Sequence, residues 1–209
     1  MMSDPLAQPA PLDAPSTPPD DGQLDDLLQR SRRLDWRFLL PDPELGRVVY
    51  YGPADDPLRV ALADFAESVT NGESVAPGAA DRFDVAVLRH QPVEALARAR
   101  SLLRPGGTLY VEVQRRAGRD LPWQARRYVA TIERSGFRHV EAFWNWPDFT
   151  RCTKIMPLHD ATALAYVIVN NRRGIAAWLT HSAVRVVFRL GMAGWFVPSL
   201  SLIGRREQP

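Results

Sequence analysis

The stretch from Asp81 to Val113, DRFDVAVLRHQPVEALARARSLLRPGGTLYVEV, places the tightest limit on the fold. Phe83 to Leu88 is a short apolar run, which is typical of a parallel strand buried on both faces. Pro105-Gly106-Gly107 ends the helix that follows, because proline cannot continue a helix and glycine accepts the left-handed conformation that closes the turn. Thr108 to Val113 is the second predicted strand. The apolar positions of the helix recur at helical spacing: Leu96, Ala99, Leu102 and Leu103.

A strand, a crossover helix and a parallel strand within about thirty residues predict one right-handed βαβ unit. Leu34 to Leu40 is apolar, and we expect it to pack Trp36 and Phe38 against the sheet. The other predicted elements, in chain order, are a helix over Leu24 to Arg33, a strand over Arg47 to Tyr51, a helix over Pro57 to Ser68, a short strand at Val69-Thr70, a helix over Trp123 to Ser135 closed by Gly136, a strand over Phe137 to Trp144, helices over Ala161 to Asn170 and Gly174 to Leu190, and a closing strand over Ser199 to Gly204.

The βαβ segment resembles the second half of class I S-adenosylmethionine-dependent methyltransferases. There a strand after "FD", a helix ending in "LLRPGG" and a further strand follow one another, as they do from Arg82 to Val113 here. The resemblance extends onward to Ala142. It implies a three-layer α/β sandwich of Rossmann-like type, with a mostly parallel sheet that ends in an antiparallel strand. It also implies S-adenosylmethionine as cofactor and a small-molecule substrate in a bacterial pathway.

The chain departs from the family where the cofactor should bind. The family's first strand leads into a loop with two or three glycines, whereas here only Gly52 matches and Pro53 removes a backbone donor. The interval from Gly52 to Asp81 has room for one helix and one short strand, so the fold is truncated in its first half. Glu73 is the nearest candidate for the acid that holds the cofactor ribose in the family.

The resemblance assigns roles to several residues. The cofactor would lie over Tyr51, Gly52 and Pro53, with its ribose at Glu73 and its adenine near Arg89 and His90. His90 follows the "FD" strand at the carboxyl edge of the sheet, where a histidine is suited to act as a general base. Glu112, near the end of the next strand, is a candidate for binding the substrate nucleophile, or equally for pairing with an arginine.

Trp144-Asn145-Trp146-Pro147-Asp148-Phe149, which leads to Arg151 and Cys152, is the candidate substrate site. Aromatic rings beside an amide, an acid and an arginine suit a pocket that stacks a ring and fixes its polar edge. The alternative, which we favour, is that Trp144 and Trp146 lie two apart on a strand and line one face as core. Cys152 is interpreted as a small packed residue and not as a nucleophile.

Composition limits the organisation of the chain. Residues 1–23 are mostly Pro, Asp, Ala and Ser and read as a disordered tail, and residues 24–209 as a single domain. That domain would carry a helical insertion at about 147–198. A single cysteine, no signal peptide and no metal-ligand spacing around His139 or His159 indicate a cytoplasmic protein without a metal site.

Charge is divided unevenly along the chain. Through Leu103 there are 10 Arg and 17 acids, and from Arg104 onward 16 Arg or Lys and 7 acids, so the halves carry −7 and +9. The basic half could face a membrane surface, a phosphate-bearing substrate or a neighbouring acidic surface. It lacks the repeated aromatic platforms of a single-strand nucleic-acid binder.

Residues 174–197, GIAAWLTHSAVRVVFRLGMAGWFV, are interrupted too often by polar groups to span a bilayer. They could lie on a membrane surface or form a core helix over the edge of the sheet, and we favour the core helix. Two functions remain open. One is an active methyltransferase, and the other is a catalytically inactive relative that serves as a partner-binding or membrane-surface accessory protein.

Overall fold

The computed structural model describes residues 21–76, 78–89, 94–114, 121–160, 162, 164, 197 and 199–207. His90, the expected helices over 161–170 and 174–190 and the candidate membrane segment lie outside this range, apart from isolated positions. In the described part of the chain, no helix is long and apolar enough to cross a membrane.

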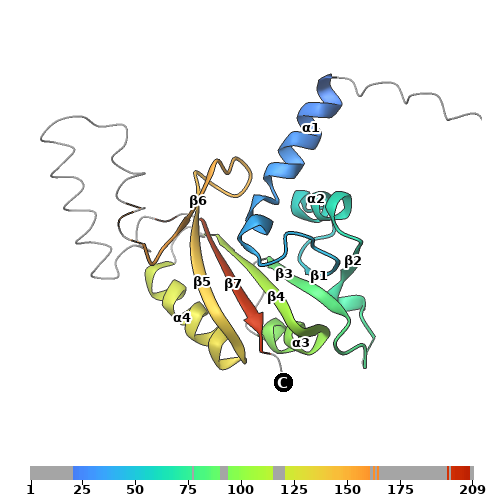
Figure 1. The fold of residues 1–209 in the computed structure, drawn as a ribbon, viewed down its shortest axis with the longest axis vertical. Helices are drawn as coiled ribbons and strands as arrows, with labels where there is room; N and C mark the ends of the chain where they lie inside the picture. Colours follow the sequence, from blue (N-terminus) through green and yellow to red (C-terminus); the bar gives the residue numbers. More distant parts are fainter. Residues whose placement is uncertain are drawn as a thin grey trace, which may run out of the picture.

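A seven-stranded mixed sheet forms the centre of the molecule (Figure 1), with the strands in the order β2-β1-β3-β4-β7-β5-β6. The pairs β1/β2, β1/β3 and β3/β4 are parallel, while β7 runs antiparallel to both β4 and β5, and β6 runs antiparallel to β5. The strands are β1 (Arg47–Tyr51), β2 (Ser68–Asn71), β3 (Phe83–Arg89), β4 (Leu103–Gln114), β5 (Phe137–Trp146), β6 (Lys154–Pro157) and β7 (Ser199–Arg206).

Two apolar clusters, one on each face of the sheet, make the molecule a three-layer sandwich. Alternation along β1 sends Val49 and Tyr51 into the cluster under α3 and α4, and Val48 and Tyr50 into the cluster under η1 and α2. The helical elements are α1 (Asp21–Arg32), η1 (Asp35–Leu39), α2 (Pro57–Phe65), η2 (Gly72–Ser74), α3 (Glu94–Leu102) and α4 (Leu121–Arg134). The fold class expected from the βαβ unit is therefore confirmed.

The helix α3 ends at Leu102, three residues before Pro105, and Gly106 has the predicted left-handed conformation with a φ of 76°. The strand β4, however, begins at Leu103, five residues before the predicted start at Thr108, and includes the Pro-Gly-Gly segment. The β3/β4 register shifts between Phe83 and Val85, so the extra residues form an irregularity at the start of the strand.

Other boundaries differ by a few residues. The first helix begins at Asp21, so residues 21–23 are helical and not part of a disordered tail. The helix α2 ends at Phe65, and β2 begins at Ser68, where a longer helix had been expected. The strand β6 lies inside the region expected to be a helical insertion and was not predicted.

One expected packing contact was wrong. Trp36 is buried and stacks on Tyr110 with ring centroids 3.8 Å apart, but Phe38 is 64% exposed. Both residues lie in η1, where two positions correspond to more than half a turn. They therefore point in different directions, and the alternation that a strand would show does not apply.

Candidate functional site

The carboxyl ends of β1 and β3 meet at the point where the chain changes direction across the sheet. From β1 the chain crosses to β2 on one side, and β3 then lies on the other side of β1. Open α/β sheets bind ligands in the crevice that forms at such a switch point. Asp56 follows β1, and Arg89 is the last residue of β3, so these two side chains flank the crevice.

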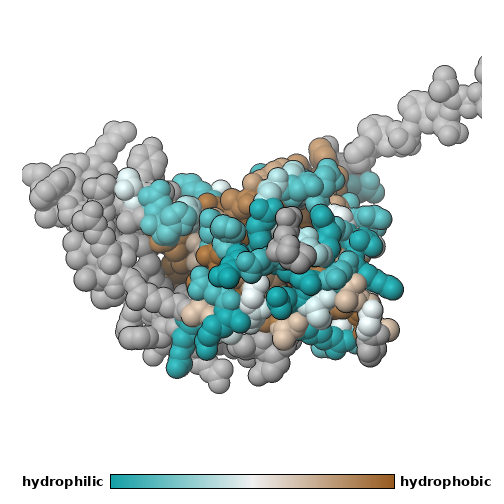
Figure 2. Space-filling view, turned by 60° about the horizontal axis from the view of Figure 1, so that its bottom comes forward, coloured by the Kyte–Doolittle hydropathy of each residue, from teal (hydrophilic) through white to brown (hydrophobic). Residues whose placement is uncertain are grey.

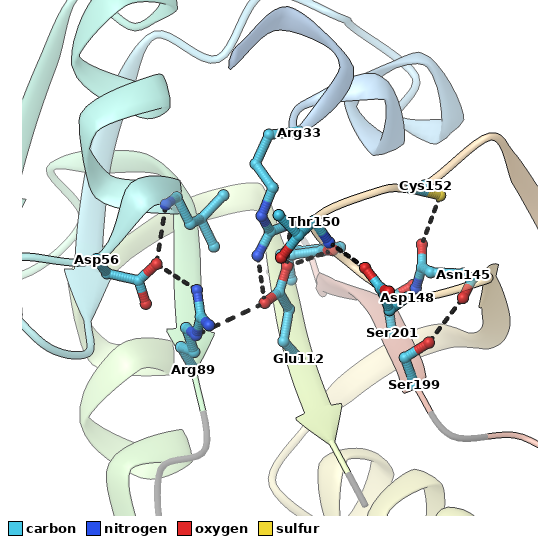
Figure 3. Close-up of polar contacts among 12 residues, drawn as sticks. Arg33, Asp56, Arg89, Glu112, Asn145, Asp148, Thr150, Cys152, Ser199 and Ser201 are labelled. Carbon is cyan, nitrogen blue, oxygen red and sulfur yellow. Dashed lines mark hydrogen bonds and ion pairs between the residues drawn. The ribbon is translucent and has the colours of Figure 1, made fainter. Parts of the chain in front are cut away.

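Asp56, which is buried, closes the crevice with an ion pair to the partly buried Arg89 (Figure 3). Its carboxylate also accepts hydrogen bonds from the Leu58 amide at 2.8 Å and from the Tyr50 hydroxyl at 2.9 Å. The position follows from local sequence, because an aspartate before Pro57 is a favoured N-cap with proline in the first helical turn.

Glu112 on β4 continues the same network. The Arg33 guanidinium, just after α1, binds both carboxylate oxygens at 2.6 and 2.7 Å, and Arg89 Nε lies 4.0 Å from Glu112 Oε2. The Tyr110 hydroxyl donates to Glu112 Oε1 at 3.0 Å. Glu112 is fully buried, and Arg33 also lies over the Phe149 ring, 5.5 Å from its centroid.

The network is electrically balanced, with two carboxylates and two guanidiniums. Burial of one such charge without a partner is costly, so each charge stabilises the others. Burial is the main cause that raises the pKa of Tyr110, and Glu112 raises it further. Burial also raises the pKa of Tyr50, with Asp56 adding to the effect. Both phenols therefore stay protonated and act as donors to the carboxylates.

Tyr50 and Tyr51 fill the spaces beside the two glycines of this edge. A Cβ built at Gly52 would lie 2.4 Å from the Tyr50 hydroxyl oxygen, and one built at Gly72 would lie 2.3 Å from the Tyr51 ring. In a cofactor loop the missing side chain lets a ligand approach the backbone. Here the side chains of Tyr50 and Tyr51 occupy the space through which a ligand would approach.

These residues do not fit S-adenosylmethionine. Pro53 offers no amide donor, and the switch-point crevice holds the Asp56–Arg89 ion pair. Asn71, at the end of β2, uses its side-chain oxygen to accept from the Glu73 amide at 3.0 Å. Glu73 itself is exposed. No step of a methyl transfer can be derived from this arrangement.

The candidate substrate residues are only partly brought together. Trp144 is buried in the core as favoured, but Trp146 is 45% exposed and meets Trp144 edge to face, so it is not a core residue. Asp148 accepts hydrogen bonds from the backbone amides of Thr150 and Arg151, which together with the Arg151 guanidinium lower its pKa. A cavity of about 360 Å³ is lined by Arg89 and the residues from Asp148 to Arg151.

Cys152 is half-buried, and burial raises the pKa of its thiol, which keeps it protonated near neutral pH. Asn145 and two serines of β7 form a neighbouring buried polar group (Figure 3). Asn145 Nδ2 donates to Ser201 Oγ at 2.8 Å, and Ser199 Oγ donates to the Asn145 carbonyl at 2.6 Å. These bonds join β5 to β7.

Sequence reasoning missed Arg33 and Asp56. Asp56 could have been found, because an aspartate before a proline at a helix start is a recognisable cap. Arg33 carried no signal, since it belongs to an arginine-rich stretch at the end of α1 and meets Glu112 only through the tertiary fold.

No protein-family model and no curated protein matches the sequence. Solved structures do resemble the fold of this chain. A SAM-dependent methyltransferase from Archaeoglobus fulgidus matches with a TM-score of 0.47 and 13% identity, over 90% of this chain and 100% of that one. A SAM-dependent methyltransferase from Thermotoga maritima matches with a TM-score of 0.45 and 12% identity, over 90% and 96%. At such values the likeness concerns the fold alone.

Proposed function

We propose that this protein is a catalytically inactive methyltransferase-like protein that acts through binding, as an accessory to a partner protein or a membrane surface. The observation that carries the proposal is the closed switch-point crevice. The Tyr50 ring stands beside Gly52, and Asp56 and Arg89 form an ion pair where a cofactor would lie.

The energetics favour the closed arrangement. A ligand at the switch point would have to separate Asp56 from Arg89 and move the Tyr50 hydroxyl away from Asp56. Leaving the buried Asp56 carboxylate without the Arg89 guanidinium would cost about 3–5 kcal/mol. A cofactor with an intrinsic free energy of about −8 kcal/mol, equivalent to micromolar affinity, would then bind at roughly millimolar concentrations.

Calorimetric titration with S-adenosylmethionine and S-adenosylhomocysteine tests this proposal. We expect no saturable heat at micromolar protein and ligand, because opening the ion pair would take up about 3–5 of the roughly 8 kcal/mol that a micromolar ligand supplies. A catalytically active methyltransferase titrated under the same conditions is the positive control. A dissociation constant in the low micromolar range for either ligand would overturn the proposal.

The second candidate function, an active methyltransferase on a small molecule, is favoured by the cavity beside Arg89 and the residues from Asp148 to Arg151. It would require the crevice to open before the cofactor enters. In that case the cofactor would lie over Tyr51, Gly52 and Pro53, and Glu112 would have to leave Arg33 to reach a substrate. The same titration, repeated with Arg89→Ala, separates the two. An enzyme that is gated by this ion pair alone would gain affinity, whereas the inactive protein would not, because Pro53 still lacks an amide donor and Tyr50 still fills the space at Gly52.

A further inference from the structure

A cavity with an arginine-rich lining lies at the end of the strands opposite the switch-point crevice. This cavity, of about 380 Å³, is called the arginine pocket below, and its lining is Gly106, Arg138, His139, Arg205, Arg206 and Glu207. It lies where β7 ends beside the starts of β4 and β5, since Arg205 pairs with Thr108 and Arg206 pairs with Phe137. Figure 2 brings this end of the molecule forward and shows a largely hydrophilic face.

Two arginines of the pocket stand opposite each other across a strand pair. In the antiparallel pair of β5 and β7, Arg138 is the partner of Arg205. Like charges directly opposite on neighbouring strands repel and destabilise the sheet. In the described part of the chain, Arg138 has one counter-charge, Glu207, with Nε and Oε2 3.4 Å apart and both side chains more than half exposed. This weak contact offsets only part of the repulsion.

The third arginine of the lining, Arg206, is held in place by contacts with other parts of the protein. Arg206 forms an ion pair with Asp81 and donates to the Leu103 carbonyl, and its side chain is only 20% exposed. A guanidinium fixed in this way loses little conformational freedom on binding a ligand. Asp81 offsets the charge of Arg206, whereas among the described residues Arg138 and Arg205 face the single carboxylate of Glu207, so the lining keeps a net positive charge.

The backbone at the pocket is also unusual. His139 has a φ of 52°, a left-handed conformation that is uncommon for a residue other than glycine. It lies in the register shift of β5 between Arg138 and Glu141. Bulges of this kind turn a side chain away from the regular strand direction and are common beside binding sites.

We propose that the arginine pocket binds a phosphate group. Planar guanidiniums with parallel N–H donors match the oxygens of a phosphate, and Arg is favoured over Lys for this recognition. The phosphate would screen Arg138 from Arg205, which removes the repulsion between them. The site lies at the end of the strands opposite the switch-point crevice and does not depend on whether a cofactor binds there.

Thermal melts and calorimetry with sodium phosphate provide the test, with sodium chloride at equal ionic strength as the reference. We expect phosphate to raise the melting temperature of the full chain and to bind with a measurable dissociation constant. The variant Arg138→Gln/Arg205→Gln should bind phosphate at least tenfold more weakly. In chloride it should melt no lower than the original chain, because the like-charge pair is gone.

The matched control is Arg32→Gln/Arg59→Gln, which removes the same charge from α1 and α2. It should keep the phosphate response, because its pocket is unchanged. General effects of phosphate on stability and of the lost charge act on both variants alike, so a loss confined to the pocket variant is due to the pocket. If the double pocket variant fails to fold, Arg138→Gln alone answers the same question. Equal phosphate responses in the original chain and in the pocket variants would overturn the proposal.

Two sources of the phosphate are separated by co-sedimentation with vesicles. Phosphatidic acid vesicles present a phosphate monoester, and phosphatidylcholine vesicles are the neutral control. Sedimentation with the first alone, lost in Arg138→Gln/Arg205→Gln, would identify a lipid headgroup. Binding of inorganic phosphate without sedimentation would identify a soluble phosphate compound. Absence of both effects in the original chain would refute the site.

Discussion

Glu112 has a role that its position in a strand did not disclose. The end of a parallel strand is a common place for a catalytic carboxylate, but here the side chain is fully buried and bound at both oxygens by Arg33. Arg33 and the Tyr110 hydroxyl bind the carboxylate directly, and burial leaves it no access to solvent. Its contribution is structural, because it ties the end of α1 to the sheet.

Replacement of Glu112 by glutamine tests this role. The change keeps the shape of the side chain but leaves Arg33 buried without a counter-charge, which should lower the free energy of unfolding by about 3–5 kcal/mol. Chemical denaturation measures the loss, with Glu44→Gln on the exposed surface as control. The double change Arg33→Met/Glu112→Leu should recover most of the stability, since apolar side chains of similar size then replace both members of this pair. A Glu112→Gln protein as stable as the original would contradict the assignment.

Helix α1 stands away from the sheet in Figure 1, and its apolar positions contribute little to the core. Leu24, Leu27 and Leu28 are 44%, 45% and 48% exposed, whereas Leu34, two residues beyond the end of the helix, is completely buried. The contact of α1 with α2 includes the ion pair of Arg30 with Asp64. Such a helix is held mainly through its last turn and the segment that follows.

A pair of alanine substitutions distinguishes these two parts. Leu27→Ala should change the free energy of unfolding by no more than about 0.5 kcal/mol, as exposed substitutions generally do. Leu34→Ala removes a fully buried side chain and should cost about 2–5 kcal/mol. Thermal or denaturant unfolding of both variants measures the difference. A comparable loss in both would mean that the apolar face of α1 is covered in solution.

At the level of the whole chain, the described fold begins at α1. Residues 1–20 are rich in Pro, Asp and Ala and offer no apolar face, so their removal should leave the melting temperature within experimental error. Removal of residues 1–34 would also take away Arg33 and Leu34 and should lower it by many degrees. Differential scanning calorimetry of the two truncations tests this expectation. A clear drop with the shorter truncation would show that the first twenty residues bind to the domain.

Local sequence determined the elements that depend on neighbouring residues. The strand, helix and Pro-Gly-Gly turn from Phe83 onward were recognisable because burial on both faces, helical spacing and the left-handed turn at Gly106 each leave a mark in adjacent positions. The resemblance of this unit to one family then implied the three-layer sandwich and the antiparallel end of the sheet. Helix ends were less certain, since propensity changes gradually over the last turn of α2.

Tertiary structure alone decided what occupies the edges of the sheet. Arg33 and Glu112 are 79 positions apart, and Arg138 and Arg205 meet only because β7 inserts between β4 and β5. Charge pairing acts through space and is independent of the sequence separation, so no local pattern announces it. The sequence pointed to a weakened cofactor loop from its missing glycines. That the crevice is filled by Tyr50, Asp56 and Arg89 follows from side-chain packing across three elements.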